Sequence, residues 1–322
     1  MLTDPLLEAL DEVTQAQPYV PDVGDAVRRG QRLQSKRRRI AIAGATLAAV
    51  GILTGVLVAL PGSSDQNASV IPAPVASATP APPASSPTAP PPAPTRTPAD
   101  PALVRQVTTL PTAEFASIPA STDGSGLTEV NGSPLVVDGK PIVFWDGAEY
   151  SPFCAVERWP LVVALSRFGT WSSLSTLTSA SGDTPSDIDT FSFYGARYES
   201  PYVSFQSVET YTNQLAGSGF YQPLQTLTTA QAALVQRYDR TNGSIPFLDI
   251  ANAFVMTGAS YDYSVLEGKN SGQIAAALLD PTSDVSKRVI GSANAITAAI
   301  CTVTGNQPSS VCSVPPITAT RH

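Results

Sequence analysis

The sequence predicts an α/β protein in which a mixed β-sheet is flanked by helices and is preceded by one transmembrane helix and a disordered linker. Three observations lead to this prediction. The first third of the 322-residue chain holds a long uncharged apolar run, and a proline-rich stretch follows it. The remaining residues, roughly 220, suffice for one hydrophobic core. In this last part, strand-like alternation and helix-like spacing of apolar residues succeed one another, which is typical of a mixed sheet with helices.

The apolar run covers residues 40–60 and contains no charged residue. As a helix rising about 1.5 Å per residue, it would span roughly 30 Å, the thickness of the hydrocarbon core. A basic cluster at 36–39 precedes it directly. The positive-inside rule therefore predicts that residues 1–39 form a short cytoplasmic tail and that the rest of the chain lies outside the cell membrane.

A cleaved signal peptide is the alternative for this run, but the run and the leader before it are both long for one. Within the run, Gly51 and Gly55 form a G-x-x-x-G spacing. This spacing can dimerise membrane helices, although Gly and Ala are abundant throughout the segment. These glycines therefore allow a homodimer through the membrane helix.

Residues 61–100 are rich in Pro, Ala, Ser and Thr, and twelve of these forty residues are proline. Such a composition has too little apolar surface to fold and favours an extended chain. We expect a spacer that holds an extracytoplasmic domain, residues 101–322, away from the membrane. The net charge of −7 argues against a nucleic-acid partner, because phosphate binding needs clustered Lys and Arg.

The first elements of the domain can be read in order. An Asp-Gly pair at 138–139 predicts a hairpin between the apolar segments 135–137 and 140–144. Helical spacing of apolar residues predicts a helix over 152–167. Alternation then predicts strands over 172–179, 190–194 and 202–205, followed by a helix over 229–238.

The last elements begin at Pro246, which a strand tolerates only at its start or edge. We expect a strand over 247–250, paired as a hairpin with 253–258, and then helices over 272–279 and 284–303.

The most informative segment is the start of the helix that follows strand 142–145. Ser151 is a good N-cap and Pro152 suits the first helical position, so Cys154 falls in the first turn. A strand that delivers a cysteine into a helix start in this way is the thioredoxin arrangement. Ser151 stands where a dithiol enzyme carries its attacking cysteine. The helix dipole favours a thiolate at Cys154, whereas the alternative is a small buried apolar residue. In thioredoxin-like folds a cis proline faces this cysteine, and Pro246 is the candidate.

This segment resembles a thioredoxin-like family filed as a domain of unknown function (DUF929). The resemblance runs from about Val130 to Cys312, and the block at 244–247 contributes to it. Its hallmark, E-Y-C-P-F-C-A-x-E-R-W, is matched at Glu149, Tyr150, Pro152, Phe153, Cys154, Ala155, Glu157, Arg158 and Trp159. The resemblance implies the fold and a connection with disulfide chemistry. Ser151 departs from the pattern, and a hydroxyl cannot replace the thiolate that disulfide exchange requires.

The chain has three cysteines, Cys154, Cys301 and Cys312, which allow three different pairings. We favour Cys301–Cys312, because Gly, Asn and Pro between them suit a turn, and this leaves Cys154 unpaired. Such a bridge would stabilise the domain by about 2–3 kcal/mol and fits an oxidising compartment.

Other chemistries find little support. The one histidine is the last residue, His322, which argues against a Ser-His-Asp triad and against a histidine-based metal site. No phosphate-binding or dinucleotide glycine loop occurs. The loop 181–189 holds three aspartates but lacks the spacing of a calcium loop. We therefore expect neither a metal nor a cofactor.

Two functions fit these residues. The first is a membrane-anchored extracytoplasmic thioredoxin-like protein with impaired redox chemistry that serves the cell envelope as a binding module. Its client would be an extended peptide or a protein. The second is a monothiol thiol-disulfide oxidoreductase or isomerase that acts through Cys154. The residues expected to contact a client are Glu149, Tyr150, Ser151, Phe153 and Pro246.

Overall fold

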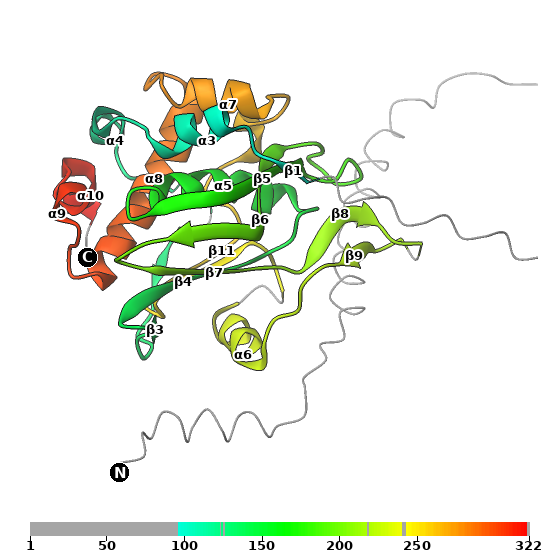
Figure 1. Cartoon of the computed structure of the whole chain (residues 1–322), viewed down its shortest axis with the longest axis horizontal. Helices are drawn as coiled ribbons and strands as arrows, with labels where there is room; N and C mark the ends of the chain where they lie inside the picture. The colour runs from blue at the N-terminus through cyan, green and yellow to red at the C-terminus, as the bar shows by residue number, and fades with distance from the viewer. Residues whose placement is uncertain (1–95, 123, 125, 218, 240–242, 321–322) are drawn as a thin grey trace, which may run out of the picture. The chain divides into compact units, whose positions relative to one another are not determined.

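The computed structural model describes residues 96–122, 124, 126–217, 219–239 and 243–320 (Figure 1). The predicted cytoplasmic tail, the predicted membrane segment at 40–60 and nearly all of the predicted linker lie outside these ranges. In the part of the chain that is described, no helix is both long enough and apolar enough to cross a membrane.

A six-stranded mixed sheet forms the centre of the domain, which confirms the predicted mixed α/β class. Strand β4 (Lys140–Gly147) pairs in parallel with β7 (Ser204–Glu209) on one side and antiparallel with β10 (Phe247–Ile250) on the other. Beyond β10 lie β11 (Phe254–Thr257) and β2 (Thr128–Glu129), and the short β3 (Val136–Val137) pairs with the start of β4. The hairpin predicted at Asp-Gly is thus the β3–β4 hairpin.

Side chains on β4 alternate between the two faces of this sheet. Val143 and Trp145 belong to the main hydrophobic core, which includes buried residues of α5 (Pro152–Leu165) and α8 (Asp284–Val303). Phe144 belongs to a smaller cluster on the opposite face, against which α6 (Thr229–Tyr238) packs. Figure 1 shows α6 below the sheet and α5 and α8 above it.

Two β-hairpins are inserted into this framework. The first consists of β5 (Thr170–Thr178) and β6 (Asp189–Glu199), which lie between α5 and β7 in the chain and pair with β1 (Thr97–Pro98) in a separate sheet. Trp171 of β5 stacks on Phe193 of β6 with ring centroids 5.8 Å apart. The second hairpin, β8 (Tyr211–Leu215) with β9 (Tyr221–Pro223), follows β7.

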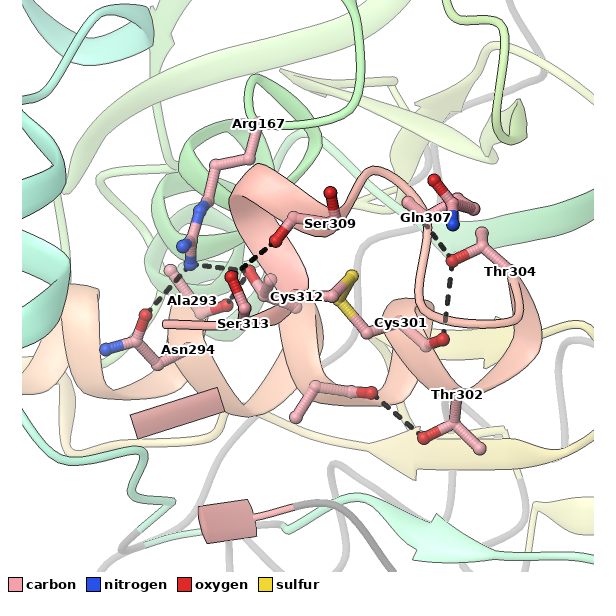
Figure 2. Close-up of a disulfide and its surroundings, with 12 residues drawn as sticks. Arg167, Ala293, Asn294, Cys301, Thr302, Thr304, Gln307, Ser309, Cys312 and Ser313 are labelled. Carbon is pink, nitrogen blue, oxygen red and sulfur yellow. Dashed lines mark hydrogen bonds between the residues drawn. A yellow bond between two sulfur atoms is a disulfide. The ribbon is translucent and has the colours of Figure 1, made fainter. Parts of the chain in front are cut away.

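Short helices complete the domain. Helices α3 (Pro101–Thr108) and α4 (Thr112–Ser117) precede the sheet, the 3-10 helix η1 (Tyr263–Val265) and α7 (Ser271–Ala277) lead into α8, and α9 (Ser309–Cys312) and α10 (Pro315–Thr320) follow it. A disulfide joins Cys301 of α8 to Cys312 of α9, with 5.6 Å between the Cα atoms (Figure 2). This is the pairing that the sequence favours.

Candidate functional site

The candidate site lies where β4 ends and α5 begins. The Ser151 hydroxyl accepts a hydrogen bond from the Cys154 amide at 3.3 Å, and Pro152 occupies the start of the helix. This is the local capping that the sequence predicts. The Ser151 residue is only 3% exposed, so its hydroxyl is committed to the helix and largely covered.

The Cys154 thiol lies inside the protein, with 0% of the residue exposed. Burial raises the pKa of this thiol to about 12, and the positive charge of Arg158 and the hydrogen bond to Ser151 offset the effect only in part. The expected preference for a thiolate at the helix start is therefore outweighed by desolvation. Among the described residues Cys154 is the one free cysteine, because the other two are bonded to each other.

Pro246 lies at the same end of the sheet as the start of α5. Phe247 stands opposite Asp146 in the β10–β4 register, so the preceding Pro246 falls beside the end of β4. The Ile245–Pro246 peptide bond is cis, as the sequence predicts. The Pro246 carbonyl accepts a hydrogen bond of 2.7 Å from the Gly258 amide.

Glu149 connects three segments of the domain through hydrogen bonds. Its carboxylate accepts hydrogen bonds of 2.6 Å from Arg96 and 2.6 Å from the Ser192 hydroxyl, and its amide donates to the Tyr211 carbonyl. Arg96 also lies 4.4 Å from the centre of the Tyr194 ring. Glu149 is expected from the sequence to contact a client, yet both of its oxygens are engaged inside the domain.

A buried ion pair lies directly beneath the start of α5. Arg158 donates to Glu209 through Nε at 3.0 Å and Nη2 at 2.7 Å, and Nη2 also donates to the Ala148 carbonyl. Trp145 adds a hydrogen bond of 3.2 Å to Glu209. The Arg158 guanidinium is thus tied to the end of β7 and to the turn before the helix. The sequence singles out Arg158 only as part of the family hallmark, and no local signal identifies its partner Glu209.

Aromatic residues form the outer part of the site. Tyr150 stacks on Tyr221 of the β8–β9 hairpin with ring centroids 4.1 Å apart. Tyr211 of the same hairpin contacts the Tyr150 ring edge-on. Phe153 is 43% exposed and contacts Tyr263 edge-on at 6.2 Å. Of the residues predicted to bind a client, Phe153 is therefore the one with an exposed ring, whereas Tyr150 is partly buried in its stack with Tyr221.

A polar cavity of about 440 Å³ lies beside this aromatic group. Its walls include the hydroxyls of Thr178 and Ser179 and the carboxylates of Asp187 and Asp189. The Ala180 amide, on the same wall, donates to the Tyr150 carbonyl. Asp189 is already bonded to the Thr178 hydroxyl and the Ser271 amide. Within the described ranges, no group of three or more His, Cys, Asp or Glu residues could hold a metal ion.

Comparison with known proteins identifies a family without an assigned activity. No protein with a curated description matches the chain, and no solved structure does. The model of a family described as a domain of unknown function (DUF929) matches residues 127–302. The match includes β4, the start of α5, Glu209 and Pro246, and it covers more than half of the 322 residues. The chain therefore belongs to the DUF929 family.

Proposed function

We propose that this chain is a membrane-anchored extracytoplasmic protein with a thioredoxin-like domain that lacks dithiol redox activity and serves the cell envelope as a binding module. The observation that carries this proposal is the state of the one free thiol. Cys154 is fully buried, its pKa is raised to about 12, and the helix N-cap next to it is Ser151, which has no sulfur.

The order of the strands supports a thioredoxin-like domain. The order β7-β4-β10-β11 across the sheet, in which β10 alone runs antiparallel to the other three strands, is the order of that fold. The helix after β4 starts with the cysteine segment, and a cis proline precedes β10. The β5–β6 and β8–β9 hairpins are additions to this framework.

The chemistry of exchange supports the loss of redox activity. Attack on a disulfide requires a thiolate with access to solvent and, in a two-cysteine cycle, a second sulfur that resolves the mixed disulfide. The serine hydroxyl of Ser151 cannot attack, and the thiol of Cys154 has neither access nor a favourable pKa. A membrane anchor at residues 40–60 rests on the sequence, and an oxidising compartment is supported by the disulfide Cys301–Cys312.

The binding role rests on the exposed ring of Phe153 beside the partly buried pair Tyr150–Tyr221. These residues border the end of the sheet where Pro246 precedes β10. An exposed aromatic ring supplies contact area at low entropic cost, which makes such rings frequent anchors for peptides and proteins. The client in this proposal is an extended peptide or an envelope protein.

The alternative function is a monothiol oxidoreductase or isomerase acting through Cys154. It is tested by the reactivity of this thiol. Intact mass is measured after brief exposure of the native full-length protein, in detergent, to excess N-ethylmaleimide. We expect no adduct until a denaturant is added. Labelling of the native protein within minutes would favour the monothiol enzyme and refute the binding-only function.

Placing a cysteine at position 151 tests whether the fold can still support disulfide reduction. We expect Ser151→Cys to form a bond with Cys154 on oxidation and to reduce insulin disulfides in the presence of dithiothreitol, while the native sequence stays inactive. Ser166→Cys, at the other end of α5, is the control for an added cysteine. Insulin reduction by the native chain at the rate of the Ser151→Cys variant would contradict the proposed loss of activity.

The binding role itself is tested on an array of extended peptides. We expect Phe153→Ala to weaken every peptide that the native chain retains, by about tenfold. Leu279→Ala is the matched control, because Leu279 is an apolar residue of similar exposure, 46%, two residues after the end of α7. Equal losses for the two variants would exclude a binding site at the start of α5.

A further inference from the structure

A second, smaller cavity lies away from the candidate site, at the opposite end of α5. It has a volume of about 160 Å³, and its walls come from α3, α4, α5 and α9. Phe115 and Val163 are among its apolar walls, and its hydroxyl groups include those of Thr108, Thr112 and Ser310. Arg167 is the one charged residue on the wall among the described residues.

The Arg167 guanidinium has only neutral partners. Its Nη1 donates to Asn294 Oδ1 at 3.0 Å and to Thr297 Oγ1 at 3.3 Å, and its central carbon lies 4.0 Å from the centre of the Phe115 ring. Figure 2 shows Arg167 reaching toward Asn294 beside the disulfide. Among the residues that the structure describes, no carboxylate lies within 4.0 Å of this guanidinium, and Nε and Nη2 make no hydrogen bond.

This environment is unusual for a cation that is largely withdrawn from water. Buried charges in proteins are normally paired, because removing an ion from water is costly. Burial lowers the pKa of Arg167 to about 10, which agrees with a positive charge that lacks an acidic neighbour. Arg167 is partly buried, whereas Arg158 is fully buried and illustrates the usual arrangement, since Glu209 faces it directly.

We propose that this cavity binds a small aliphatic monocarboxylate, with its carboxylate on Arg167 and its hydrocarbon part against Phe115 and Val163. A guanidinium with two unused donor positions matches the fork geometry of a carboxylate. The apolar walls supply the second part of the recognition. A cavity of about 150 Å³ holds a molecule the size of benzene, so an acid of four or five carbons fits the volume.

The disulfide fixes one wall of the cavity. Ser310 and Val311 of α9 line it, and the next residue, Cys312, is bonded to Cys301 of α8. The position of α9 against α8, and with it the width of the cavity, therefore depends on this bond. The proposed site is independent of the binding role at the start of α5, because none of its residues belongs to that site.

The test measures binding of n-butyrate to the full-length protein in detergent by isothermal titration calorimetry. Three probes are compared: n-butyrate, the neutral n-butanol and inorganic phosphate. We expect saturable binding of n-butyrate and at least about tenfold weaker binding of the two others, because only the acid satisfies both the charge and the apolar walls.

Two variants locate the site. Arg167→Gln should weaken n-butyrate binding by at least about tenfold, whereas Arg105→Gln, an exposed arginine on α3, should leave it unchanged. Ser310→Tyr places a ring at the exposed rim without disturbing the core and should also abolish binding, so the test does not depend on the stability of the Arg167 variant. Absence of saturable n-butyrate binding, equal binding of n-butanol or phosphate, or unchanged binding in Ser310→Tyr would overturn the proposal.

Discussion

The buried ion pair Arg158–Glu209 under the candidate site should contribute strongly to the stability of the domain. Glu209→Ala removes the partner of Arg158, whose side chain is fully buried, as is that of Glu209. The variant also deprives Trp145 of the acceptor for its indole N–H. Removing one partner of a buried pair leaves an uncompensated charge, which typically lowers the free energy of unfolding by about 3–5 kcal/mol.

This loss can be expressed as a shift of the melting temperature. For a domain of roughly 200 residues, each kcal/mol lowers the melting temperature by about 2–4 °C. We therefore expect Glu209→Ala to melt roughly 6–20 °C below the native protein. Differential scanning calorimetry gives the shift directly, and urea unfolding followed by tryptophan fluorescence gives the free energy.

The matched control is an exposed ion pair. Asp284 lies 3.8 Å from Lys287 and its side chain is 86% exposed, so Asp284→Ala should cost about 1 kcal/mol or less. The double variant Arg158→Met/Glu209→Leu removes both charges and should be more stable than Glu209→Ala. Equal free energies of unfolding for Glu209→Ala and Asp284→Ala would show that burial of the Arg158–Glu209 pair does not raise the cost of removing one partner.

Three further outcomes are expected. Replacing Cys301 and Cys312 together by alanine opens a short loop and should lower the free energy of unfolding by about 3 kcal/mol in urea titrations; an unchanged midpoint would contradict this. Burial raises the pKa of Asp146 to about 7, so the folded protein keeps a proton that the unfolded chain releases above about pH 4, and stability should fall as the pH rises from 4 to 7. Asp146→Asn should make the free energy of unfolding less dependent on pH between 4 and 7, and should raise it at pH 8 by at most about 4 kcal/mol. If the variant and the native protein show the same pH dependence in this range, Asp146 does not cause it. In Gly169→Ala the new Cβ would lie 2.2 Å from a backbone carbonyl, whereas at Gly217 it meets nothing within 4 Å, so thermal unfolding should show a loss of about 1–3 kcal/mol for Gly169→Ala alone.

The elements that sequence reasoning predicts well are those with strong local signals. Helix α6 has the bounds predicted from the sequence, and a capping box of Thr228 and Gln231 marks its start. Helix α8 likewise spans 284–303 as predicted, since its apolar spacing is long and regular. Helices α3 and α4 and the β8–β9 hairpin were not predicted. They are short, and their stability comes from packing against residues distant in the chain.

The candidate site shows the same division. Capping by Ser151 follows from neighbouring residue types, and the sequence predicts it. The environment of Cys154 does not follow from them, because it depends on Arg158 and Glu209, which are 51 residues apart, and on complete burial. A local argument from the helix dipole favours the thiolate, whereas the tertiary structure reverses the preference.

The start of the described domain has a mechanical consequence. Arg96 bonds to Glu149 just before α5, and the next two residues, Thr97 and Pro98, pair with β5. A pull on the chain from its N-terminal side would load this ion pair and this two-residue ladder before it reached any helix of the core. A force applied from the N-terminal side would therefore act first on the turn that contains Tyr150 and Ser151.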